Sequence, residues 1–234
     1  MNTRKSSGWV EWLGWATLVV VAVGLYLSFI YAPTEAQMGS IQRIFYFHLG
    51  ADTVGLGAII VAAVASILYL RSGKAGYDRV ALASMELGLV FGLIALLTGM
   101  IWARPVWGTW WTWDPRLTTF LILWLIYIAY LMLRATASGD PRMARLAAVF
   151  AIVGVADVPL VIIAPRIWRG ISPVLFGVND VQQFSFNMEP PMVVALVVSI
   201  IGFLMLYVYL LAQRVQLETL RSEVEALHTG EMVG

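Results

Sequence analysis

Six long apolar runs constrain the fold of this chain more than any other feature of its sequence. They cover approximately residues 12–31, 44–70, 80–101, 117–133, 147–163 and 192–212. An α-helix needs about 20 apolar residues to cross roughly 30 Å of hydrocarbon, and each run is close to that length. No run alternates apolar and polar residues with a period of two, which excludes transmembrane β-strands. We therefore predict an all-α membrane protein with six transmembrane helices in a single domain over residues 1–212.

The composition supports the same class of protein. Hydrophobic residues make up 60% of the 234 residues and charged residues only 12%, whereas about a quarter of a soluble domain is charged. A net charge of +1 argues against nucleic-acid binding. The chain has no cysteine, which excludes disulfides and thiolate metal sites and leaves His48 and His228 as its only imidazoles.

The distribution of basic residues predicts the orientation, because Lys and Arg are enriched in cytoplasmic loops. With both termini in the cytoplasm, ten basic residues lie inside: Arg4, Lys5, Arg71, Lys74, Arg79, Arg134, Arg142, Arg145, Arg214 and Arg221. Five lie outside: Arg43, Arg104, Arg116, Arg166 and Arg169. We therefore expect both termini in the cytoplasm and three loops outside, at about 32–43, 102–116 and 164–191.

Residues 213–234 are predicted to form a cytoplasmic amphipathic tail. Apolar residues spaced three and four apart share one face of a helix there: Leu217, Leu220, Val224 and Leu227. This face could dock a partner, or it could lie on the protein's own surface or on the membrane.

The segment WARPVWGTWWTWDPRLT at 102–118 contains five of the ten tryptophans. One or two tryptophans at this depth would be typical of an aromatic belt at the membrane surface. Five of them, interleaved with Arg, Gly, Pro and Asp, exceed what anchoring needs. Because closely spaced indoles suit a flat ligand with delocalised electrons, we predict that this outer loop binds a tetrapyrrole.

His48 lies near the outer end of the second predicted helix, at the same depth as the tryptophan-rich loop. Neutral imidazole is a common axial ligand of haem iron, so His48 is a candidate ligand; a hydrogen-bonded packing residue is the alternative. Asp52 lies one turn deeper on the same face. The outer arginines could together bind the two haem carboxylates, whereas each alone could extend to lipid headgroups.

Two acids lie inside predicted helices, where charged groups are costly. We interpret Glu86 and Asp157 as polar contacts between helices or with a partner. Asp157 precedes Val158 and Pro159, and proline is expected to kink the fifth helix there.

These residues together resemble the heme exporter protein C family, whose members handle haem in cytochrome c biogenesis. WGTWWTWDPRLT at 107–118 resembles the family's tryptophan-rich WWD motif. YFHLG at 46–50, MELGLVFG at 85–92 and DVPLV at 157–161 also resemble family segments. The similarity covers about residues 30–210.

The resemblance implies a transfer protein, not an enzyme, and one without its own ATPase. It would hold haem b non-covalently at the outer face of the cytoplasmic (inner) membrane and pass it to a periplasmic haem chaperone. The partners implied are an ABC-type ATPase, its membrane subunit and a small single-helix accessory protein, in addition to membrane lipid. Two alternatives are the membrane subunit of an ABC-type permease for a small apolar solute and a b-type haem electron-transfer subunit.

Carried over by position, the resemblance makes His48 the first axial ligand of the iron. The remaining haem-binding residues would be Arg104, Trp107, Gly108, Trp110, Trp111, Trp113, Asp114, Arg116, Arg166, Arg169 and Ser172. Ser172 stands where the family has its second axial histidine. The iron position opposite His48 is therefore expected to take water or another group, with Met188 as a candidate.

Overall fold

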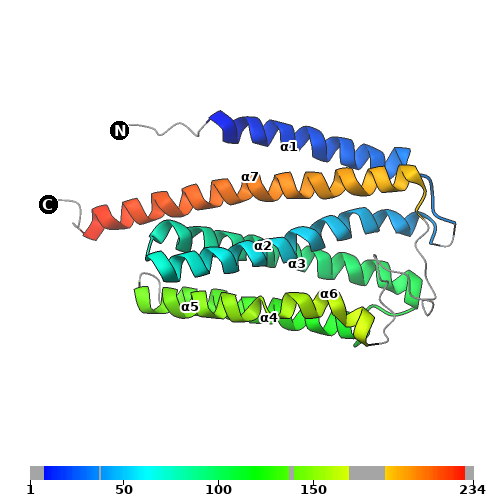
Figure 1. The fold of residues 1–234 in the computed structure, drawn as a ribbon. Helices are drawn as coiled ribbons and strands as arrows, with labels where there is room; N and C mark the ends of the chain where they lie inside the picture. The colour runs from blue at the N-terminus through cyan, green and yellow to red at the C-terminus, as the bar shows by residue number, and fades with distance from the viewer. Residues whose placement is uncertain (1–7, 37, 137–139, 169–187, 230–234) are drawn as a thin grey trace.

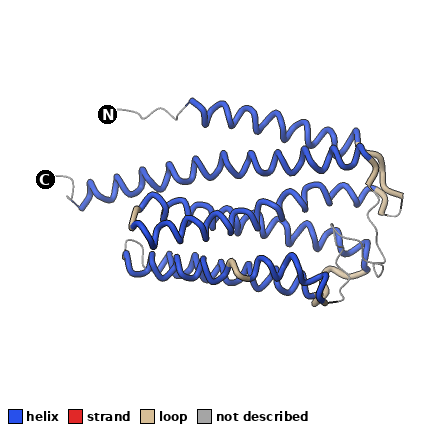
Figure 2. The backbone as a smooth tube through the Cα atoms, viewed as in Figure 1, coloured by secondary structure: helices blue, strands red, loops and turns tan. Residues whose placement is uncertain are grey.

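The computed structural model describes residues 8–36, 38–136, 140–168 and 188–229. Within these ranges all regular secondary structure is helical, and the helices run side by side along one long axis (Figures 1 and 2). Six helical spans are long and apolar enough to cross a membrane, which confirms the predicted fold class.

The helices agree with the predicted spans, with some differences at their ends. Helix α1 covers Gly8–Tyr26 and continues as a π-helical turn, η1, at Leu27–Tyr31. A 3-10 turn, η2, at Ser40–Arg43 leads into α2 at Ile44–Ser72. Four helices lie between α2 and the last helix: α3 Ala75–Trp107, α4 Pro115–Thr136, α5 Pro141–Gly154 and α6 Asp157–Ile167. Helix α7 covers Pro190–Thr229, so the predicted tail continues the last span without a break.

The fifth span consists of two helices, and Pro159 lies in the first turn of the second. Proline has no N–H to donate to the carbonyl of Val155, four residues earlier. The Val155 carbonyl instead accepts the Val158 N–H at 3.1 Å, and the chain turns between α5 and α6. The predicted kink is therefore confirmed. Asp157 begins α6, and its Oδ2 is buried with no hydrogen-bond partner among the described residues.

Helices α2 and α3 form a tightly packed hairpin because small residues face each other across it. A Cβ added to Gly55 would lie 3.2 Å from the backbone nitrogen of Gly92. Such close contact is typical of helix pairs in membranes, where packing and hydrogen bonds replace the hydrophobic driving force. Ser84 on α3 donates a 2.7 Å hydrogen bond to the Ala58 carbonyl and lies 2.6 Å from the hydroxyl of Tyr207 on α7.

Helix α1 lies at the edge of the bundle, beside α7 (Figure 1). Gly24 allows the two helices to approach, because an added Cβ there would meet Ser199 at 3.7 Å. The hydroxyl of Ser199 lies 3.3 Å from that of Ser28. The opposite face of α1 exposes large apolar side chains, as a lipid-facing helix would.

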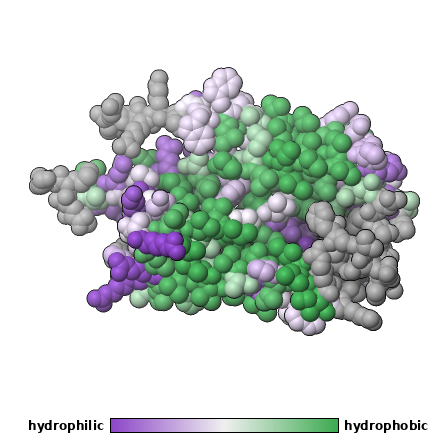
Figure 3. Space-filling model, viewed as in Figure 1, coloured by the Kyte–Doolittle hydropathy of each residue, from purple (hydrophilic) through white to green (hydrophobic). Residues whose placement is uncertain are grey.

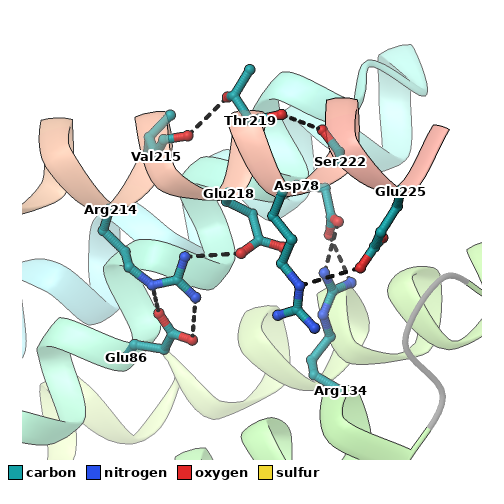
Figure 4. A network of polar contacts seen from close by, with 10 residues as sticks. Asp78, Glu86, Arg134, Arg214, Val215, Glu218, Thr219, Ser222 and Glu225 are labelled. Atoms are coloured by element: carbon teal, nitrogen blue, oxygen red, sulfur yellow. Dashed lines mark hydrogen bonds and ion pairs between the residues drawn. The ribbon is translucent and has the colours of Figure 1, made fainter. Parts of the chain in front are cut away.

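Ion pairs join the helices at the end of the bundle that carries the termini (Figure 4). Arg134 on α4 donates two hydrogen bonds to the carboxylate of Asp78 on α3, at 3.0 and 2.8 Å. Arg214 on α7 binds the carboxylate of Glu86 at 2.6 and 2.9 Å and that of Glu218 at 2.8 Å. The predicted role of Glu86 as a polar contact between helices is thus confirmed.

Both termini lie at one end of the bundle, and the connections after η1 and between α3 and α4 lie at the other (Figure 1). On the face seen in Figure 3, most of the surface between these two ends is apolar, as a membrane-embedded region requires. The arrangement agrees with an even number of spans. That the termini are cytoplasmic remains a prediction.

Candidate functional site

A pocket opens at the end of the bundle away from the termini, between α2, α3 and the start of α4. Its empty volume is about 800 Å³, part of which is continuous with the surroundings. The lining is mostly apolar and comes from α2, α3, the α3–α4 connection and α4: Phe45, His48, Leu49, Asp52, Ala95, Leu96, Gly99, Met100, Trp102, Ala103, Trp107, Trp110, Trp111, Arg116, Leu117 and Phe120. The fold therefore brings His48 and the tryptophan-rich segment together, as predicted from their depth.

The tryptophan-rich segment is less of a loop than the sequence indicated. Helix α3 continues to Trp107 despite Pro105, so only residues 108–114 lie outside helices. Gly108 ends α3 in the left-handed conformation, with φ of 74°, and its N–H donates to the Arg104 carbonyl at 3.0 Å. Trp102 and Arg104 are therefore held on a helix, which fixes their positions more firmly than a loop would.

Four of the five tryptophans line the pocket and one does not. Trp102 and Trp107 pack edge to face, with ring centroids 5.1 Å apart at an interplanar angle of 84°. Trp111 packs in the same way on Trp113, at 5.8 Å and 82°. Trp113 itself is absent from the lining and 76% exposed. Trp113 therefore contacts the pocket only through Trp111 in this structure, and its role in haem binding remains a prediction.

Asp114 and Gly108 shape the connection and do not line the pocket. The Oδ1 of Asp114 accepts the backbone N–H of Arg116 at 2.9 Å, and Pro115 occupies the first helical position. This is the N-cap arrangement that begins many helices. Asp114 is only 6% exposed, so its carboxylate stabilises the start of α4.

Among the predicted arginines whose side chains the structure describes, Arg116 is the one in the pocket lining. Its Nη2 lies 3.4 Å from Oδ2 of Asp52 on α2, which gives the polar side of the pocket a paired charge. The guanidinium of Arg104 instead donates to the carbonyl of Gly108, at the end of its own helix. The side chain of Arg166, and the whole of Arg169 and Ser172, lie outside the described residues.

The imidazole of His48 is held by α3 through one ring nitrogen. Its Nδ1 lies 3.0 Å from the carbonyl oxygen of Ala95 and 3.2 Å from the hydroxyl of Thr98. A carbonyl oxygen only accepts, so the neutral ring must carry its proton on Nδ1. The other ring nitrogen, Nε2, then keeps a free lone pair, which is the state that binds a metal.

Gly99 makes this arrangement possible, and the sequence analysis did not identify it. A Cβ at residue 99 would lie 3.1 Å from Cε1 and 3.5 Å from Nδ1 of His48, so any larger residue there would push the ring away from α3. Ala95 and Thr98 were also missed. The only signal in the sequence was a glycine in a helix three residues before Trp102.

Met188 packs elsewhere. It contacts a cluster around Phe45, Tyr46 and Met192 and is absent from the pocket lining. The structure thus gives no support to Met188 as an iron ligand.

Comparisons with known proteins agree with the fold and the motif. The family described as heme exporter protein C matches residues 2–230. The heme exporter protein C of Rhodobacter capsulatus is 34% identical over 232 residues, covering 97% of this chain and 93% of the relative. That of Escherichia coli K12 is 35% identical over 211 residues, covering 89% and 83%. That of Bradyrhizobium diazoefficiens is 32% identical over 218 residues, covering 93% and 81%. This chain belongs to the heme exporter protein C family.

Proposed function

We propose that this chain is the haem-binding membrane subunit of a cytochrome c maturation system. It holds haem b non-covalently in the pocket between α2, α3 and α4, at the outer face of the inner membrane, and transfers it to a periplasmic haem chaperone. In this proposal, an ABC-type ATPase, its membrane subunit and a small single-helix protein act with it. Membership of the heme exporter protein C family supports the assignment.

The observation that carries the proposal is the state of His48. Its Nδ1 is bonded to the Ala95 carbonyl, so Nε2 carries a lone pair and no proton, in a pocket whose walls include four tryptophans. A free imidazole nitrogen supplies an axial ligand for iron, and the indole and aliphatic walls supply apolar contact for a porphyrin. Arg116 adds a cationic group at the polar side of the same pocket.

The second axial position is not filled by a histidine of this chain in the proposed state. The only other histidine, His228, lies on the last turn of α7, at the opposite end of the bundle from the pocket (Figure 1). We therefore expect a ferric spectrum that differs from that of low-spin haem with two histidine ligands.

The experiment compares His48→Ala with His228→Ala in purified, haem-supplied protein. Each variant removes one imidazole, and the His228 side chain is exposed and far from the pocket, which makes it a matched control. A pyridine haemochrome assay should show that His48→Ala loses most of the bound haem and that His228→Ala retains it. Haem content unchanged in His48→Ala would contradict the assigned ligand. Lack of haem in the unmodified protein would contradict the function.

A further inference from the structure

Two indole N–H groups on the pocket wall are buried without acceptors. The Nε1 atoms of Trp102 and Trp111 find no hydrogen-bond partner in the described parts of the chain, and both residues line the same pocket. Elsewhere in the bundle, the part-buried Trp124 donates its N–H to the Leu89 carbonyl at 3.0 Å. Buried donors in native proteins are nearly always paired, so two unpaired ones in one pocket indicate a ligand that accepts hydrogen bonds.

The pocket has few charged groups of its own that could bind the acceptor atoms of such a ligand. The charged lining residues within the described chain are Asp52 and Arg116, which pair with each other at 3.4 Å. Arg104 is turned toward the carbonyl of Gly108 and is absent from the lining. A ligand with anionic oxygens would therefore meet one paired guanidinium and two free N–H donors.

The position of Trp102 relative to His48 suits contact with the edge of a ring. Trp102 follows Thr98 by four residues on α3, and Thr98 contacts the His48 ring at 3.2 Å. Four helical residues advance about 6 Å along the axis, so Trp102 lies one turn farther out than the contacts that hold the proposed iron ligand. The strong acceptors of haem are its two carboxylates, which lie at the ring edge and away from the iron.

We propose that the indole N–H groups of Trp102 and Trp111 donate hydrogen bonds to the propionate oxygens of haem in this pocket. This inference rests on the proposed function and assigns these two tryptophans to recognition of the carboxylates. The proposal assigns no hydrogen bond to Trp107 or Trp110, which line the pocket beside them. The pocket would then prefer a porphyrin with free carboxylates because of these two indole N–H groups, in addition to any charged group that contributes.

The test replaces Trp102 and Trp111 with Phe, singly and together, because Phe keeps an aromatic ring and removes only the N–H and part of the ring. Trp110→Phe is the matched control, since Trp110 lines the same pocket but its Nε1 is not among the buried unpaired atoms. Each protein, purified in detergent, is titrated with haem and with haem dimethyl ester, whose carboxylates are capped. Size-exclusion chromatography checks that each variant is folded.

Each Phe variant at 102 or 111 should bind haem about 10-fold more weakly, as expected for loss of a hydrogen bond to a charged group. Its affinity for the dimethyl ester should stay near that of the unmodified protein, and Trp110→Phe should keep the preference for haem. Equal weakening toward both ligands, or unchanged haem affinity, would overturn the inference. If the double variant does not fold, the single variants decide. Failure of the unmodified protein to bind either porphyrin would instead refute the proposed function.

Discussion

Substitution of Gly99 by Ala tests how the fold prepares His48 for a ligand. The added Cβ would lie 3.1 Å from Cε1 of His48, closer than ordinary van der Waals contact, so the ring must move by a few tenths of an ångström. Gly99 lies on the same helix as Ala95, one turn farther out. A ring that moves away from α3 therefore also stretches the 3.0 Å contact between Nδ1 and the Ala95 carbonyl.

The expected effect is large on haem binding and small on folding. A hydrogen bond of this kind contributes about 0.5–1.5 kcal/mol, and overpacking costs about 1–3 kcal/mol. Loss of the partners that orient a metal ligand typically weakens metal binding about 10–100-fold. Replacing Gly by Ala within a helix stabilises that helix by up to about 1 kcal/mol, which offsets part of the overpacking. We therefore expect haem to bind about 10-fold more weakly with little change in thermal stability.

The assay is a haem titration of the purified protein, followed by absorbance in the Soret region. Gly57→Ala on α2 is the control, because its Cβ would meet nothing within 4 Å and it brings the same gain in helix propensity. Gly57→Ala should bind haem as the unmodified protein does. If Gly99→Ala binds haem with the same affinity and the same spectrum as the unmodified protein, the orientation of His48 by α3 does not matter for binding.

Three further predictions concern packing, charge and topology. Gly55→Ala should lower the midpoint of thermal unfolding, because its Cβ would lie 3.2 Å from backbone in α3, with a cost of about 1–3 kcal/mol; an unchanged midpoint would argue against the close α2–α3 contact. Asp78→Asn should destabilise the protein by about 1.5–3 kcal/mol, since Arg134 then loses its carboxylate in a pair with side chains only 17% and 18% exposed; adding Arg134→Gln should recover part of that loss. A single cysteine at Thr109 should react with a membrane-impermeant reagent from the periplasm, and one at Gly76 should react only after the membrane is opened; the reverse labelling would invert the proposed orientation.

The sequence alone determined the number of spans and the end of the molecule at which His48 and the tryptophan-rich segment meet. A bilayer requires about 20 apolar residues per helix and satisfies no backbone hydrogen bonds, so local hydrophobicity is enough to locate six helices. Local signals also marked the kink near Pro159 and, through Trp102–Trp113 and His48, the segments that meet at one end. The resemblance of the WWD segment to heme exporter protein C was confirmed by the comparisons over residues 2–230.

Only the tertiary structure decided which side chains face the pocket. The partners of His48 on α3 are 47 and 50 residues away, and Arg116 reaches Asp52 across 64 residues. These contacts depend on how each helix is rotated about its own axis. In a membrane, that rotation is set by the fit of small residues such as Gly55 against a neighbouring helix. Apolar periodicity cannot report this rotation, because lipid and protein interior are both apolar. For this reason the sequence could not show that Trp113 is exposed outside the pocket lining, or that Gly99 lies against the imidazole of His48.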